Sequence, residues 1–188
     1  MTTYISSLTI PSFILEKPAA SILLPIALGT AVGFSTRPDR TRNTYRTIKN
    51  PPGHPPPAAF GPVWTVLYGC MGYAAYRVWT TGMNVFDAKT TLLAKQGATL
   101  YSIQLGLNLL WMPLFFGLGR PIEATADIVT LTGLNAYLTY IYSKVDPVAA
   151  WLQMPYVAWL SYATYLSAGA GYLNDWSFEG KELGSKDD

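Results

Sequence analysis

Long stretches of apolar residues with few charges recur five times along the chain, separated by shorter polar segments. A helix needs about 20 apolar residues to cross roughly 30 Å of hydrocarbon. We therefore expect five transmembrane helices, at about residues 18–36, 58–80, 96–119, 122–143 and 147–174. The alternative is a large buried helical core in a soluble protein. The pattern predicts an all-α membrane protein built as a bundle of five transmembrane helices.

The segments outside these stretches suggest one transmembrane domain over residues 18–176. Residues 1–17 precede it as an N-terminal segment. Residues 37–57 form the longest loop, and its proline-rich end predicts a stiff collar, because proline fixes φ and removes a hydrogen-bond donor. Residues 177–188 are charged and poor in apolar side chains, so we expect a disordered tail there.

The composition supports a membrane protein and argues against most enzyme classes. Only 13% of the residues are charged, whereas soluble domains have about 25%. The net charge of +2 gives no broad basic surface for nucleic acid. Cys70 is the single cysteine and His54 is the single histidine. The chain therefore has no internal disulfide and no cysteine or histidine cluster for a metal ion. We therefore expect no catalytic residues and no required cofactor.

The distribution of lysine and arginine predicts the orientation in the membrane. Eight of them lie on the side of loop 37–57 and the C-terminus, and five lie on the opposite side. Positive charge is enriched on cytosolic loops. The loop 37–57 and the C-terminus are therefore expected in the cytosol.

The third stretch carries polar side chains on one helix face. Gln104, Asn108 and Trp111 follow each other at helical spacing. Amides are costly in hydrocarbon, so this face should point into the bundle. Such amides either join neighbouring helices by hydrogen bonds or line a ligand site, and the spacing does not decide between the two.

Other stretches place aromatic rings beside small residues. Trp64 and Tyr68 share a face of the second stretch, and the fifth carries the set Trp159, Ala163 and Ser167 at helical spacing. Gly29 and Gly33 form a GxxxG pair, which predicts helix pairing. Aromatic rings near helix ends can instead belong to an interfacial belt. Rings deeper in the stretches favour a cavity that holds a planar, apolar molecule.

Four longer stretches together resemble a known family. They are PPxxxFGPVWTVLYxxMGYAAYxVW, QLxLNxxWxPLFF, ADIVxL and PYVAWLSYATYLS, and they occur in this order over most of residues 50–174. They resemble the translocator protein family, which includes TspO, the tryptophan-rich sensory proteins and the peripheral benzodiazepine receptors. The proline-rich collar looks more like that of a fungal member than that of a bacterial or animal one.

The resemblance implies a five-helix bundle, often a homodimer, with a ligand pocket inside it. The implied ligands are porphyrins, such as protoporphyrin IX or haem, and drug-like molecules. The implied location is the mitochondrial outer membrane with a cytosolic C-terminus, or else the endoplasmic reticulum or another endomembrane. Matching positions imply pocket residues at Trp64, Asn108, Trp111, Trp159 and Ala163. Helical spacing adds Tyr68, Gln104 and Ser167, and charge in the loop suggests Arg46, Lys49 and His54 as partners for porphyrin propionates.

Two departures from the family pattern bear on ligand choice. Many members have tryptophans in a W-x-P-P-x-W loop motif, where this chain has Gly53 and Ala58. The sterol-recognition pattern of animal members needs a basic residue soon after Tyr172, and none follows closely. A looser match occurs at Leu138, Tyr140 and Lys144, although such patterns are weak. Sterol binding is therefore a weaker expectation than porphyrin binding.

The leading functional hypothesis is a membrane receptor or carrier for porphyrins and related apolar ligands, with a role in tetrapyrrole or lipid handling and stress response. A second is a photo-oxidative enzyme that degrades porphyrin with Trp64 and Trp159. A third is a regulatory scaffold within an outer-membrane complex. No nucleic-acid partner is expected.

Overall fold

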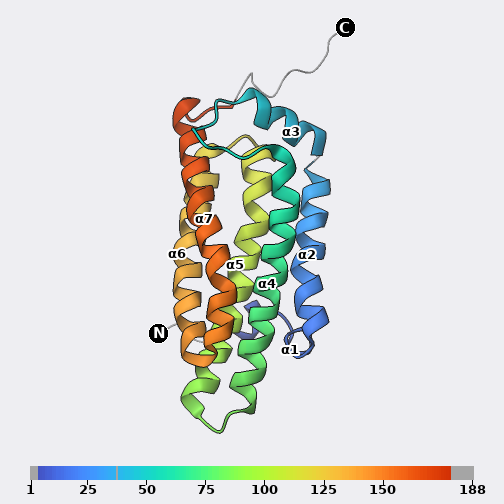
Figure 1. The fold of residues 1–188 in the computed structure, drawn as a ribbon, viewed down its shortest axis with the longest axis vertical. Helices are drawn as coiled ribbons and strands as arrows, with labels where there is room; N and C mark the ends of the chain where they lie inside the picture. Colours follow the sequence, from blue (N-terminus) through green and yellow to red (C-terminus); the bar gives the residue numbers. More distant parts are fainter. Residues whose placement is uncertain (1–3, 37, 179–188) are drawn as a thin grey trace.

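The computed structural model describes residues 4–36 and 38–178, and this part of the chain contains helices and no strands (Figure 1). The five long helices are α2 (Pro18–Ser35), α4 (Pro57–Asn84), α5 (Ala88–Met112), α6 (Pro121–Val145) and α7 (Pro147–Leu173). The short elements are the 3₁₀ turn η1 (Ser6–Leu8), α1 (Ser12–Leu15), α3 (Pro38–Thr47) and the π-helical turn η2 (Pro113–Gly117). The prediction of an all-α bundle with five long helices is confirmed.

The long helices have lengths suited to a bilayer. At 1.5 Å per residue, their 18 to 28 residues span about 27–42 Å. Among the described residues, Pro18–Ser35 (mean hydropathy 1.6) and Ala88–Gly117 (1.2) are long and apolar enough to cross a membrane by length and composition alone. Each of the other three long helices contains at least three tyrosines, whereas these two segments contain one at most. Within α2 only Ser21 and Pro25 are buried, so this apolar helix exposes most of its surface.

Local signals explain where the helices begin. Proline occupies the first turn of α2, α4, α6 and α7, where its missing N–H is not needed. Asp87 caps α5 and Asp146 caps α7 by accepting hydrogen bonds from backbone amides. Helix α5 therefore begins at Ala88, eight residues before the predicted start at residue 96. The helix is longer than the apolar stretch because the more polar residues that precede this stretch are also helical.

The long helices pack around α4. This helix contacts α2, α5 and α7, while α6 packs against α5 and α7, and α2 lies at the edge of the bundle beside α4 (Figure 1). Gly72 makes the α2–α4 contact possible, since a Cβ atom there would overlap the carbonyl oxygen of Ser21. At Pro113 the α5 helix widens into the π turn, because proline lacks the N–H that would continue the α-helical hydrogen bonding.

Both ends of the chain pack against the bundle where they are described. The Ile5 amide donates to Thr99 Oγ1 (3.1 Å) and the Ile10 amide to Ser102 Oγ (2.8 Å), both on α5. Phe178 is 1% exposed and its ring lies 5.1 Å from that of Phe115. Phe178, at the start of the predicted disordered tail, is therefore packed among other aromatic rings. Residues 179–188 lie outside the described part.

Candidate functional site

A cavity of about 500 Å³ lies inside the bundle at the end covered by α3. We call the part of the bundle from α3 down to Asn108 the cavity half, and the part from Gln104 to the α4–α5 connection the closed half. Four long helices, α3 and the loop after α3 contribute to the cavity wall. The wall includes Gly29, Gly33, Thr41, Arg42, Tyr45, Phe60, Gly61, Trp64, Tyr68, Asn108, Trp111, Phe115, Phe116, Ala163 and Ser167.

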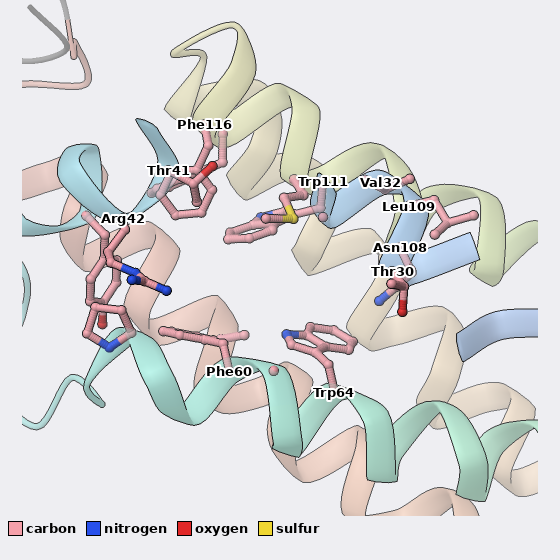
Figure 2. Close-up of a pocket in the computed structure, with 18 of the residues that line it drawn as sticks. Thr30, Val32, Thr41, Arg42, Phe60, Trp64, Asn108, Leu109, Trp111 and Phe116 are labelled. Atoms are coloured by element: carbon pink, nitrogen blue, oxygen red, sulfur yellow. The ribbon is translucent and has the colours of Figure 1, made fainter. Parts of the chain in front are cut away.

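Aromatic rings form two opposed sides of the cavity. Figure 2 shows Phe60 and Trp64 of α4 on one side, with Trp111 and Phe116 of the α5–η2 segment across the open space. Trp111 is stacked on Phe115, with ring centroids 5.0 Å apart and an interplanar angle of 20°. Rings held by such contacts present flat, rigid faces, which suits a flat apolar ligand.

Glycines keep the space between these rings open. A Cβ atom at Gly33 or Gly61 would have no neighbouring atom within 4 Å. At Gly29, by contrast, a Cβ atom would overlap the ring of Tyr68. The predicted pairing role therefore fits Gly29, which packs on α4 through Tyr68. Gly33 meets no neighbouring helix and lies on the cavity wall instead.

Hydrogen-bonded side chains form the floor. The hydroxyl of Tyr68 donates to Asn108 Oδ1 (2.7 Å), and Asn108 Nδ2 donates to the hydroxyl oxygen of Tyr156 (2.9 Å). These contacts join α4, α5 and α7 across the bundle. Asn108 thus takes both of the roles that its spacing allowed, because it links helices and also lines the cavity.

Helix α3 forms the roof and brings a cation to the cavity. Arg42 extends from α3 toward the space between the rings (Figure 2), and no carboxylate among the described residues forms an ion pair with it. Tyr45 is 9% exposed and donates its hydroxyl to the Pro55 carbonyl (2.9 Å). Burial, and then the neighbouring Tyr162, raises the pKa of Tyr45 to about 12, so this hydroxyl keeps its proton at neutral pH.

The proline-rich collar is fastened to α7. The Lys49 amide donates to Asn174 Oδ1 (3.1 Å), and Asn174 Nδ2 donates back to the Lys49 carbonyl (2.9 Å). The hydroxyls of Tyr162 and Tyr165 donate to the carbonyls of Gly53 (2.7 Å) and Pro52 (3.1 Å). These contacts hold the chain between α3 and α4 in place and so fix the position of the roof.

Two buried indole donors have no acceptor among the described residues. The Nε1 atoms of Trp111 and Trp159 are buried and make no hydrogen bond in the described part of the chain. An unpaired buried donor is costly. The ring of Trp111 lines the cavity, but its Nε1 is itself buried, so a ligand acceptor can reach this N–H only if the ring turns.

The cavity brings together six of the eight residues predicted to bind ligand by resemblance or helical spacing. These are Trp64, Tyr68, Asn108, Trp111, Ala163 and Ser167.

Gln104 and Trp159 differ from that prediction. Gln104 is fully buried in the closed half, where its Nε2 lies 3.6 Å from Met71 Sδ and its Oε1 accepts from Asn135 (3.3 Å). The ring of Trp159 lies behind the wall, 6.5 Å from Trp64 and 6.1 Å from Phe60 between centroids. Gln104 therefore joins helices, and Trp159 supports the rings that face the cavity.

The cationic loop residues also lie elsewhere than predicted. Arg46 and Lys49 are exposed and do not line the cavity, and neither does His54, which packs edge-on against Tyr45. Sequence reasoning missed Arg42 because residues 37–57 were expected to form a loop. A helix beginning at Pro38 places Thr41, Arg42 and Tyr45 on neighbouring positions of one face, which would have identified Arg42.

Comparison with known proteins gives one consistent result. Residues 21–173 match the model of the TspO/MBR family. The chain is 41% identical over 152 residues to the translocator protein homolog of Schizosaccharomyces pombe, covering 81% of this chain and 88% of that protein. It is 36% identical over 150 residues to the human translocator protein (80% and 86%). It is 35% identical over 159 residues to the tryptophan-rich protein TspO of Archaeoglobus fulgidus (84% and 97%).

Proposed function

The chain belongs to the TspO/MBR family of integral membrane proteins, and from this premise we propose that it is a receptor or carrier for porphyrins and related flat, apolar ligands. The proposed ligand site is the cavity below α3. Protoporphyrin IX and haem are the proposed tetrapyrroles, and drug-like molecules or sterols are further ligands of the same site.

One observation supports this proposal above the others, namely the combination of opposed flat rings with a cation, Arg42, that has no ion pair among the described residues. Trp64 and Trp111 present aromatic faces to a cavity of about 500 Å³, within the size range of small-molecule sites. A porphyrin has a flat apolar ring system that stacks on such faces. Its acidic propionates need cationic or N–H partners at one end.

Arg42 is the proposed partner of a propionate. It reaches from α3 toward the cavity, whereas Arg46, one helical turn away, does not line it. The guanidinium group has a geometry that matches a carboxylate. The porphyrin would therefore lie with its ring between the aromatic sides and its acidic edge toward α3.

The test is a titration of the purified protein in detergent with protoporphyrin IX in the dark, following tryptophan fluorescence and porphyrin absorbance. We expect saturable binding in the micromolar range. The Trp64→Ala variant should bind about tenfold more weakly because it loses a stacking surface. Trp151→Ala is the matched control, since that indole is exposed on the outside of α7. Equal binding by both variants would mean that porphyrin only partitions into the micelle.

A second titration tests the orientation of the ligand. Arg42→Gln should weaken protoporphyrin binding about three- to fivefold, the range for a partly exposed charge pair. It should leave binding of the protoporphyrin dimethyl ester unchanged, because the ester carries no acid. Arg46→Gln is the control. A loss with Arg46→Gln but not with Arg42→Gln would restore the prediction made from the sequence.

Location and assembly are proposed on the same premise. The protein would lie in the mitochondrial outer membrane with its C-terminus in the cytosol, with an endomembrane such as the endoplasmic reticulum as the alternative. It would act as a homodimer. Protease protection of a C-terminal tag in isolated organelles would test the orientation.

A second candidate function is light-driven breakdown of bound porphyrin. The observation that favours it is the contact between Trp64 on the cavity wall and Trp159 behind it, with ring centroids 6.5 Å apart. Two adjacent indoles could share the oxidation of an excited ligand. Porphyrin turnover that persists in the dark in the Trp64→Phe, Trp159→Phe variant would exclude this mechanism.

A further inference from the structure

A second hollow lies on the outside of the bundle, at the end opposite α3, where α6 passes into α7 (Figure 1). Its volume is about 310 Å³. Tyr140 and Ser143 of α6 form one side, and Ala150, Trp151 and Met154 of α7 form the floor and the other side. We call this hollow the α6–α7 groove. It is separate from the porphyrin cavity and does not depend on the function proposed for that cavity.

The walls of the α6–α7 groove are apolar and face outward. Trp151 is 73% exposed and Tyr140 is 56% exposed. Ala150, by contrast, is buried and gives the groove its depth. Because these residues lie on the outside of a membrane bundle near the ends of two helices, the molecules that meet them come from the bilayer. The volume is about ten times the volume of one water molecule, enough for part of an acyl chain.

A lysine, Lys144, lies beside this groove. Lys144 is in the last turn of α6, and its Nζ lies 5.0 Å from the centre of the Tyr140 ring. No carboxylate in the described residues forms an ion pair with it. The ring and the helix C-terminus favour a cation here, but neither carries a full negative charge.

The nearest acid in the sequence cannot neutralise Lys144. Asp146 is 5% exposed, and its Oδ2 accepts from Arg77 Nε (2.8 Å). Its Oδ1 accepts from the amide of Val148 (2.9 Å) at the start of α7. The fold thus turns this carboxylate inward, toward α4 and α7. The positive charge at the rim of the groove remains available to an external anion.

We propose that the α6–α7 groove binds one anionic phospholipid, with an acyl chain between Tyr140 and Trp151 and the phosphate headgroup on Lys144. Aromatic walls that lead to a cation match a molecule with an apolar chain below a negative group. The groove would thereby select anionic over zwitterionic lipid at this end of the protein.

A second lysine, Lys95, serves as a control that distinguishes binding in the groove from general attraction of anionic lipid to positive charge. Lys95 of α5 lies over a tyrosine ring, 5.9 Å from the centre of Tyr4, and it does not border the groove. It also lies at a similar depth. Gly97 of α5 packs on Tyr142 of α6, and the two helices are antiparallel. Lys95 lies two residues before Gly97 and Lys144 lies two residues after Tyr142, so both are displaced toward the end opposite α3.

The experiment is native mass spectrometry of the full chain in detergent with equal amounts of phosphatidylglycerol and phosphatidylcholine of identical acyl chains. We expect one retained lipid, with phosphatidylglycerol preferred about fivefold, the effect of one lysine near an anionic headgroup. Lys144→Gln should bring the ratio near one, and Lys95→Gln should leave it unchanged. Ala150→Leu, which fills the floor, should reduce retention of both lipids. Trp151→Ala is a second wall variant, and circular dichroism checks that each variant is folded.

Three results would overturn the proposal. Equal losses with Lys144→Gln and Lys95→Gln would mean that anionic lipid only follows general charge. Retention of added cholesterol in place of phosphatidylglycerol, unaffected by Lys144→Gln, would assign the groove to a neutral sterol. Loss of a dimer upon Ala150→Leu, with lipid retention unchanged, would assign it to contact with a second copy of the chain.

Discussion

The cavity half and the closed half of the bundle use the same kinds of residue for opposite purposes. In the closed half, Gln153 Nε2 donates to Asn135 Oδ1 (2.9 Å), and Asn135 Nδ2 donates to Gln104 Oε1 (3.3 Å). These amides are fully buried and link α5, α6 and α7. In the cavity half, a Cβ atom at Gly33 would meet no atom of the described residues within 4 Å, and the rings of Trp64 and Trp111 border an open space of about 500 Å³. Packing is thus completed in one half and left open in the other.

The comparison suggests how stability and binding are divided along the bundle. Residues of the closed half hold the helices together, so their substitution should lower the free energy of unfolding. Residues of the cavity half leave space unfilled, so their substitution should change ligand affinity. Substitutions of similar kind in the two halves can test this division.

The largest expected effect comes from a comparison of Gly72, which is packed in the closed half, with Gly33, which lies on the cavity wall. A side chain at Gly72 overlaps the Ser21 backbone, so Gly72→Leu must separate α2 from α4 and should cost about 3 kcal/mol of unfolding free energy. Gly33→Leu extends into open space, so it should leave stability unchanged and weaken protoporphyrin binding about tenfold, equivalent to about 1.4 kcal/mol. Unfolding in mixed micelles and the dark titration measure the two quantities. Similar losses of stability in both variants would contradict the division.

The next effect concerns the buried amides. Asn135→Leu keeps the volume but leaves Gln153 Nε2 and Gln104 Oε1 without their partner, which should cost about 2 kcal/mol. Porphyrin affinity should not change, because Asn135 does not line the cavity. Thr130→Leu, at an exposed position of the same helix, is the control. A drop in affinity without a drop in stability would show that the amides support the ligand site instead.

These two cases also indicate what the sequence could predict. The lengths of the apolar stretches predicted the five long helices, and helical spacing predicted that Asn108 and Trp111 share one face. Spacing could not tell Gln104 from Asn108, because the two differ only in depth relative to the cavity floor. It could not separate Gly29 from Gly33, since the ring of Tyr68 comes from another helix. Arg42 was missed because the charged, proline-rich segment 37–57 has no long apolar stretch, so the short helix α3 was not predicted.

A smaller effect is expected where the collar is fastened. Asn174→Ala removes two hydrogen bonds to the Lys49 backbone and should cost about 1–2 kcal/mol locally. The collar should then open more often, so porphyrin should dissociate faster and residues 50–56 should be cleaved more readily by protease. Stopped-flow displacement and limited proteolysis measure these changes. Asn43→Ala, at an exposed position of α3, is the control, and unchanged dissociation in the Asn174 variant would mean that ligand does not leave past the roof.

The smallest effect tests the unpaired indole donor of Trp111. Trp111→Phe keeps an aromatic ring beside Phe115 but removes the Nε1–H, which has no acceptor in the described residues. The ligand-free protein should therefore lose little stability, because no hydrogen bond within it is broken. If the ring turns on binding so that a ligand acceptor reaches this buried donor, affinity should fall about fivefold in the variant, the value of one hydrogen bond of about 1 kcal/mol. Trp159→Phe removes the other unpaired indole N–H, which lies behind the wall, and should leave affinity unchanged. Equal affinity of the Trp111→Phe and Trp159→Phe variants would mean that the cavity holds its ligand by ring contacts and Arg42 alone.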